Sequence, residues 1–292
     1  MNDIPAIFFE GVVSQFFNKE FSYVSALAGL PGHIASQFYA KKFRHCMRLR
    51  NGRLEKDTYL NCKHQELDIE TPSKKLLHYT EIAIHAGEEV YSTDPKAMER
   101  VLSATKGTPV ILDLQTSNIS KEIAKCVESI RFVFVLQVKT KIPSDVLKLM
   151  RSLVKKNTLN EMEIGEDAQI EDETAQLLID LLKQKQFYQM FFYAKCSAAL
   201  KEIIASWGEN SEEMVGKIIC CKERFSELQL SLPAFPFQEC SEEEDQEAER
   251  VYPFAGFWSK IITKMVLRTQ DGRAVYCFSS SSLKFKSAFV FV

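Results

Sequence analysis

The side chains of this sequence best suited to chemistry are its histidines and cysteines. All five histidines lie in the first third of the chain, at positions 33, 45, 64, 78 and 85. Protein zinc sites combine Cys and His ligands at short, regular spacings. His45, Cys46, Cys62 and His64 are the one group of this kind, but one end of it lacks the tight pairing of a structural zinc site. We therefore expect no bound metal, and we expect the histidines at the ends of predicted strands, His64, His78 and His85, to be surface or capping residues.

The eight cysteines are spread along the chain without a compact framework, at positions 46, 62, 126, 196, 220, 221, 240 and 277. This distribution is typical of reduced thiols in the cytosol or the nucleus. The first residues lack the basic region of a secretory signal. No stretch approaches the roughly 18 consecutive apolar residues of a membrane-spanning helix. We therefore predict a cytoplasmic or nuclear protein that makes no contact with a membrane.

None of the common catalytic or cofactor-binding motifs is present. The sequence has no G-x-G-x-x-G, P-loop, H-E-x-x-H, G-x-S-x-G or C-x-x-C motif. Its net charge of −2 provides no general attraction for nucleic acid. We expect a non-enzymatic protein without a cofactor. An enzyme on a compact α/β fold is the alternative, and it would need catalytic residues that converge in one deep pocket.

A three-point apolar pattern, with apolar residues at spacing 0, +3 and +5, recurs along the chain. Its last positions from Ile84 to Phe192 are 30, 24, 26 and 28 residues apart, within or near the period of leucine-rich repeats. It occurs at His64-Leu67-Ile69, Tyr79-Ile82-Ile84, Pro109-Leu112-Leu114, Val133-Leu136-Val138, Leu159-Met162-Ile164, Phe187-Met190-Phe192 and Phe225-Leu228-Leu230. Helices are predicted between these strands, at 94–107, 119–130, 143–157, 172–186, 197–210 and 211–225. We therefore predict an α/β fold, an irregular leucine-rich-repeat-like β/α solenoid over residues 46–232; a compact α/β domain is the alternative.

The middle residue of each predicted strand points away from the core, because neighbouring side chains alternate between the two faces of a strand. On a solenoid these positions form one row that faces a protein partner. Phe191 would serve as an aromatic anchor of the interface, unless a helix or the C-terminal tail covers it. The predicted partner-binding residues are Asp113, Gln137, Glu163, Phe191 and Gln229, with Tyr193 from the next outward position.

Residues 1–45 have a different pattern, an amphipathic helix followed by a second apolar segment that Pro31-Gly32 interrupts. Ile4-Pro5 precedes the first helix, and the apolar positions that follow include Phe8, Val12, Phe16 and Phe21. This segment resembles an F-box. The resemblance implies that Ile4, Pro5, Phe8, Val12, Phe16 and Phe21 bind a Skp-type adaptor protein of a cullin-RING ubiquitin ligase.

An F-box-like start followed by β/α repeats is similar to the F-box-associated families of nematodes. This similarity implies a substrate receptor that holds an as yet unknown protein substrate on its repeats. Alternatively, the N-terminal helices are a degenerate F-box-like cap, and the chain is a free-standing repeat-type binding protein without a ligase role.

The chain changes character after the repeats. Residues 233–250 combine prolines with a run of acidic residues, which predicts a solvated loop. Residues 251–292 contain two apolar segments around Asp271-Gly272, a strong hairpin signal, and end in the alternating sequence LKFKSAFVFV. We predict a C-terminal β hairpin cap that covers the last strand of the repeats, because an uncovered sheet edge promotes aggregation.

Overall fold

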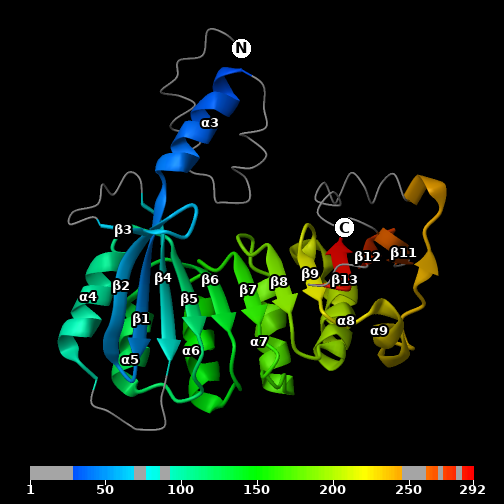
Figure 1. Ribbon diagram of the computed structural model, residues 1–292. Coiled ribbons are helices and arrows are strands. Elements are labelled where there is room, and N and C mark those ends of the chain that lie inside the picture. The colour runs from blue at the N-terminus through cyan, green and yellow to red at the C-terminus, as the bar shows by residue number, and fades with distance from the viewer. Residues whose placement is uncertain (1–28, 69–76, 86–92, 245–260, 269–271, 281–284) are drawn as a thin grey trace.

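The computed structural model describes residues 29–68, 77–85, 93–244, 261–268, 272–280 and 285–292 (Figure 1). These residues form a mixed α/β protein around one large sheet, which confirms the predicted α/β class. Within them, no helix has the length and apolarity needed to cross a membrane. The predicted adaptor-binding residues all lie outside the described part of the chain: Ile4, Pro5, Phe8, Val12, Phe16 and Phe21.

The centre of the sheet is parallel, and its strands are neighbours in nearly the order in which the chain forms them. They are β1 (Phe43–Arg50), β4 (Leu77–His85), β5 (Val110–Leu114), β6 (Val133–Val138), β7 (Glu161–Ile164), β8 (Gln189–Phe192) and β9 (Ile218–Cys221). In β4 to β8 the last two positions of the apolar pattern have no exposed surface, as at Leu112 and Leu114. Strands are therefore confirmed at all five of these places.

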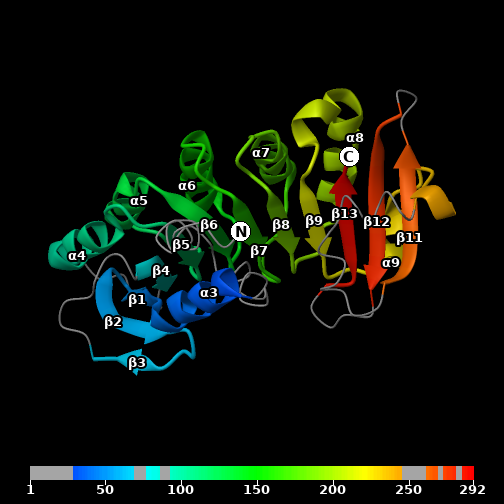
Figure 2. The ribbon, with the colours of Figure 1, turned by 90° about the horizontal axis from the view of Figure 1, so that it is seen from above.

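Five helices connect β4 to β9, one after each strand: α4 (Pro95–Thr105), α5 (Lys121–Ser129), α6 (Ser144–Lys155), α7 (Asp172–Leu182) and α8 (Ser197–Met214). They lie along the same face of the sheet (Figure 2). Right-handed crossovers between neighbouring parallel strands place successive helices on one side. The main apolar core fills the space between these helices and the sheet. We call the opposite surface of the sheet the strand face.

Local sequence signals explain where the helices begin. The Asp94 side chain accepts a hydrogen bond from the Lys96 N–H, and Pro95 occupies the first turn of α4. Ser120 caps α5 in the same way through the Ile123 N–H. The helices predicted at 94–107, 119–130, 143–157 and 172–186 are confirmed. The helix predicted at 197–210 continues to residue 214 in α8.

Antiparallel strands extend the sheet at both ends. At the first end, β1 forms a hairpin with β2 (Arg53–Asn61), and β3 (Glu66–Leu67) pairs with β2. Asn51 and Gly52 both have positive φ, 53° and 74°, which suits the tight turn of this hairpin. At the other end the order is β13 (Ser287–Phe291), β12 (Ala274–Ser280), β11 (Ile261–Arg268) and β10 (Gln238–Glu239). The β11–β12 pairing confirms the predicted C-terminal hairpin, and β13 joins it to β9.

The helix predicted at 211–225 is wrong. Helix α8 ends at Met214, Gly216 adopts a positive φ of 79°, and the fully buried strand β9 follows. Its sequence, IICC, is a short apolar segment that starts with two β-branched residues and has no helical periodicity. The last predicted strand, which was to end at Leu230, is instead the helix α9 (Phe225–Ser231), and Leu230 is 85% exposed there.

The first predicted repeat, at His64-Leu67-Ile69, is also wrong. Its residues 66 and 67 form the short edge strand β3, which is antiparallel to β2. The parallel series begins with β1 instead. Because β1 starts at Phe43, the sheet continues across the boundary that we expected between residues 45 and 46.

Candidate functional site

A row of side chains crosses the parallel strands on the strand face. Asp113 in β5 lies opposite Gln137 in β6. Gln137 lies opposite Glu163 in β7, which in turn lies opposite Phe191 in β8. Adjacent strands are about 4.8 Å apart, so each residue of this row is beside the next. The structure therefore brings together four of the predicted partner-binding residues.

The other two predicted residues have different positions. Gln229 is exposed on helix α9 and is not part of the row, because the strand predicted around it does not exist. Cys220 in β9 takes its place opposite Phe191. Tyr193 follows β8 directly, and its N–H donates to the carbonyl oxygen of Ile164 at 2.8 Å. Tyr193 thus lies beside the row, at the next position after Phe191 that faces outward.

Phe191 is buried, with 7% of its surface exposed. Its ring centre is 5.0 Å from that of Phe285, and the ring of Tyr193 is 5.1 Å from Phe285 as well. Phe285 lies two residues before the start of β13, so part of the C-terminal tail covers Phe191, as in the alternative considered above. Phe191 belongs to a second apolar cluster with Ile218, Cys220, Val266, Ala274, Tyr276, Phe278, Phe285, Ala288 and Val290.

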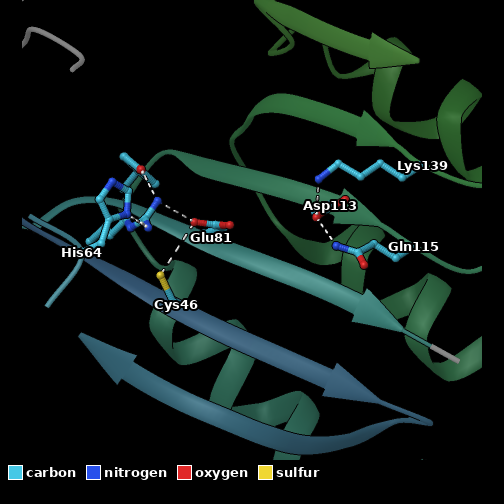
Figure 3. Close-up of polar contacts among 8 residues, drawn as sticks. Cys46, His64, Glu81, Asp113, Gln115 and Lys139 are labelled. Carbon is cyan, nitrogen blue, oxygen red and sulfur yellow. Dashed lines mark hydrogen bonds and ion pairs between the residues drawn. The ribbon is translucent and has the colours of Figure 1, made fainter. Parts of the chain in front are cut away.

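Asp113 lies in the polar part of the row and is only 3% exposed. Its Oδ2 accepts hydrogen bonds from Gln115 Nε2 at 2.5 Å and from Lys139 Nζ at 2.9 Å (Figure 3). Its Oδ1 is buried, and no described residue donates a hydrogen bond to it. Buried polar atoms normally have a hydrogen-bond partner. Because this oxygen has almost no accessible surface, a bound molecule could reach it only after the side chains around it rearrange.

A second polar group surrounds Arg44 at the start of β1. Its guanidinium donates to the Tyr79 hydroxyl at 3.2 Å, to Glu81 at 3.1 Å and to His64 Nδ1 at 2.6 Å (Figure 3). The Cys46 thiol is 3.7 Å from the same Glu81 carboxylate. Burial, and next the charge of Glu81, raise the pKa of Cys46 to about 12. Cys46 is therefore a thiol at neutral pH and a poor nucleophile.

His45 points to the other side of the sheet, among residues that face the helices. Its Nε2 pairs with Asp57 in β2, and Asp57 also accepts from Arg100 of α4 at 2.7 Å. The His45 ring, 2% exposed, stacks on Tyr59 with ring centres 4.4 Å apart. This network joins β1, β2 and α4. His45 and Cys46 thus lie on opposite faces, and no group of three or more potential metal ligands occurs within the described residues.

The sequence analysis missed the residues around Arg44 because it placed no strand between 43 and 61. Two signals were present. Asn51-Gly52 is a typical hairpin turn, and the segment FRHCMRLR before it alternates between buried and more exposed positions. Together they predict a β hairpin in which Arg44, Cys46 and Arg48 share one face.

Comparisons with known proteins give no match: no protein-family model fits the chain, and no curated protein or solved structure is similar to it.

Proposed function

We propose that this chain is a protein-interaction molecule and that its partner binds the strand face around Asp113, Gln137 and Glu163. Helices cover one face of the sheet, so a binding surface of this kind is built from strand residues on the other. The observation that carries the proposal is the polar row on this face, in which Gln137 and Glu163 are partly exposed beside the buried carboxylate of Asp113. A bound partner can form hydrogen bonds with these exposed side chains, each contributing about 0.5–1.5 kcal/mol.

We further propose that the repeating units form an irregular leucine-rich-repeat-like β/α solenoid. Consecutive parallel strands are neighbours, and one helix follows each of β4 to β8. Each unit buries its apolar side chains against the next, as in repeat proteins. On this basis the strand face is the extended surface that such proteins use for recognition.

The specific role we propose is that of a substrate receptor for a cullin-RING ubiquitin ligase. The F-box-like residues 1–45 would bind a Skp-type adaptor, and the strand face would hold the protein substrate. The support is the resemblance of the N-terminal sequence. A free-standing binding protein with a degenerate helical cap is the second candidate. Pro31 and Gly32 lie in the first turn of helix α3 (Leu30–Lys41). They interrupt the second apolar segment of the F-box-like sequence, and this interruption favours the second candidate.

Adaptor binding is tested by a pull-down of the full chain with a Skp-type adaptor. The double change Phe8→Asp and Val12→Asp should abolish binding with the circular dichroism spectrum unchanged. Val215→Asp with Leu230→Asp is the matched control, because these apolar residues are 51% and 85% exposed in the repeat region. Equal binding by all chains would exclude binding through Phe8 and Val12, and no binding by the folded wild type would exclude the receptor role.

The binding surface is tested separately, by comparing the proteins that cross-link to wild-type and variant chains. Gln137→Lys with Glu163→Lys changes the strand face. Gln176→Lys with Glu173→Lys makes the same change of charge on exposed positions of α7, on the helix side. A partner of the strand face is lost only from the first variant. A partner that both variants retain binds elsewhere and contradicts the proposal.

A further inference from the structure

Two buried cysteines meet where helix α8 starts beside the end of strand β9. Cys196 is the residue before the first turn of α8, and Cys221 is the last residue of β9. Their Sγ atoms are 3.2 Å apart, although the residues are 25 positions apart in the chain. The sulfur atoms of a disulfide are about 2.05 Å apart. The two sulfurs therefore need to approach by only about 1.2 Å to form a bond.

The backbone on both sides of this pair is held in place. The Cys196 N–H donates to Glu223 Oε2 at 2.6 Å, and Glu223 lies two residues after Cys221. The Glu223 carbonyl oxygen accepts from the Ser287 hydroxyl of β13 at 2.9 Å. Phe192, four residues before Cys196, lies opposite Cys221 in the sheet. These contacts keep the start of α8 beside the end of β9.

The alternation of side chains along β9 decides which cysteine Cys196 can reach. Cys221 shares the main apolar core with Cys196, whereas Cys220 belongs to the second apolar cluster. Neighbouring side chains of a strand point to opposite faces of the sheet. The sulfur of Cys220 accepts a hydrogen bond from Gln189 Nε2 at 3.6 Å on its own side. Cys196 can therefore pair with Cys221 and not with Cys220.

Burial decides when the two sulfurs can react. Cys196 is 1% exposed, and Cys221 has no exposed surface. The hydrogen bond between the two thiols, and next burial, raise the pKa of Cys196, and burial raises the pKa of Cys221. Because the thiolate is the reactive form, both cysteines react slowly in the folded chain. Before the apolar core closes around them, a small oxidant can reach both.

We propose that Cys196 and Cys221 form a disulfide when the chain folds in the presence of a small-molecule disulfide such as oxidised glutathione. One thiolate attacks the oxidant and releases a first glutathione; the other cysteine attacks the mixed disulfide and releases a second, and the two cysteine protons end on the two glutathione thiols. The new bond joins α8 to β9, and the core then shields it from reductants.

A chain that folds under reducing conditions keeps both thiols. The redox conditions during folding thus set whether α8 is covalently fixed to the sheet, and this inference does not depend on the function proposed above.

The test is to unfold the reduced full chain in urea and refold it with either oxidised glutathione or dithiothreitol. Free thiols are then alkylated, and the peptides are mapped by mass spectrometry. Cys196→Ala removes one partner, and Cys220→Ala is the matched control on the same strand. The wild type and Cys220→Ala should contain a peptide that links Cys196 to Cys221. Their Tm should be about 5 °C or more above that of the same chains refolded in dithiothreitol, and Cys196→Ala should show no such rise.

The protection by the core is tested on the folded, reduced wild type in the same glutathione buffer. It should form the bond at least about tenfold more slowly than the refolding chain. Wild type that refolds with oxidised glutathione but keeps Cys196 and Cys221 as thiols would overturn the proposal, as would a bond from Cys196 to another cysteine. Equal rates in the folded and the refolding chain would overturn the protection. If Cys196→Ala does not fold, Cys221→Ala serves instead, and the peptide map of the wild type needs neither variant.

Discussion

Asp113→Asn should leave the free protein about as stable as the wild type, although it removes a buried charge from an ion pair. The change keeps the shape of the side chain. The amide oxygen can still accept from Lys139 or Gln115, which both donate to Oδ2 in the wild type. What disappears is a carboxylate that is 3% exposed and has one oxygen without a donor among the described residues.

The magnitude follows from two opposing contributions. Lys139 is 46% exposed, so its ion pair with Asp113 is partly screened by solvent and contributes roughly 0–1 kcal/mol. Against this, the half-satisfied carboxylate costs the folded state about 1–3 kcal/mol. The Asn side chain also leaves a buried polar atom without a partner at the place of Oδ1, so most of this cost remains. We therefore expect Asp113→Asn to change the free energy of unfolding by between about −1 and +1 kcal/mol, and to weaken binding of a strand-face partner about tenfold, or 1.4 kcal/mol.

Urea unfolding followed by circular dichroism measures the first quantity, with Lys139→Met as the companion variant. Removing the lysine leaves the carboxylate buried without its cation, so this change should destabilise the chain by about 1–3 kcal/mol. The expected change in the free energy of unfolding is small for Asp113→Asn and larger for Lys139→Met. A loss of 2 kcal/mol or more for Asp113→Asn would refute the reasoning, because the carboxylate would then be a structural group.

Three further predictions concern the sheet that positions this row and the helices packed on it. Gly165→Ala should destabilise the chain by about 1–3 kcal/mol, since the added Cβ would be 2.7 Å from the Cα of Lys139. Gly208→Ala in α8, where the Cβ meets no described atom within 4 Å, should stabilise the chain by about 0.5–1 kcal/mol. Urea unfolding measures both changes in stability. An unchanged stability of Gly165→Ala would contradict the close packing of the strands. Burial alone would raise the pKa of Asp57, but hydrogen bonds from an arginine and a histidine outweigh it and lower the pKa. Its charge therefore stabilises the fold above the unfolded pKa of about 4, and this contribution is lost as the pH falls below it. Asp57→Asn should flatten the acid side of the stability profile, unlike Asp145→Asn at an exposed site.

The sequence was sufficient for the elements whose side chains repeat with a clear period. The strand ending at Leu114 and helix α6 each combine an apolar pattern with recognisable ends. In both, the packing of the folded chain keeps the secondary structure that this pattern predicts. Strand β9 failed for a physical reason. A run of four buried apolar residues is compatible with a helix and with a strand, so its composition does not decide between them. Pairing with the neighbouring strands β8 and β13 selects the extended form.

The polar groups were harder to foresee, because they depend on contacts between distant positions. Arg44 and Glu81 are 37 residues apart, and Asp113 and Lys139 are 26 apart. Their proximity follows from the register of β1 with β4 and of β5 with β6, which an apolar pattern alone leaves undetermined. The row itself could be predicted, since every member has the same place in its strand. The burial of Asp113 within the row could not, and the burial of Phe191 was only one of two alternatives.

The composition of the row changes along the sheet, and this change narrows the proposed binding surface to part of the strand face. From β5 to β7 its members are Asp113, Gln137 and Glu163, of which the last two are partly exposed. From β8 onwards it continues through Phe191, Cys220, Ala288 and Phe278, all buried. An apolar cluster that is already buried within the chain has little surface left to bury against a partner. The polar half has partly exposed side chains at Gln137 and Glu163. We therefore propose that a partner binds at β5 to β7, and that the buried aromatic residues hold the C-terminal strands on the sheet.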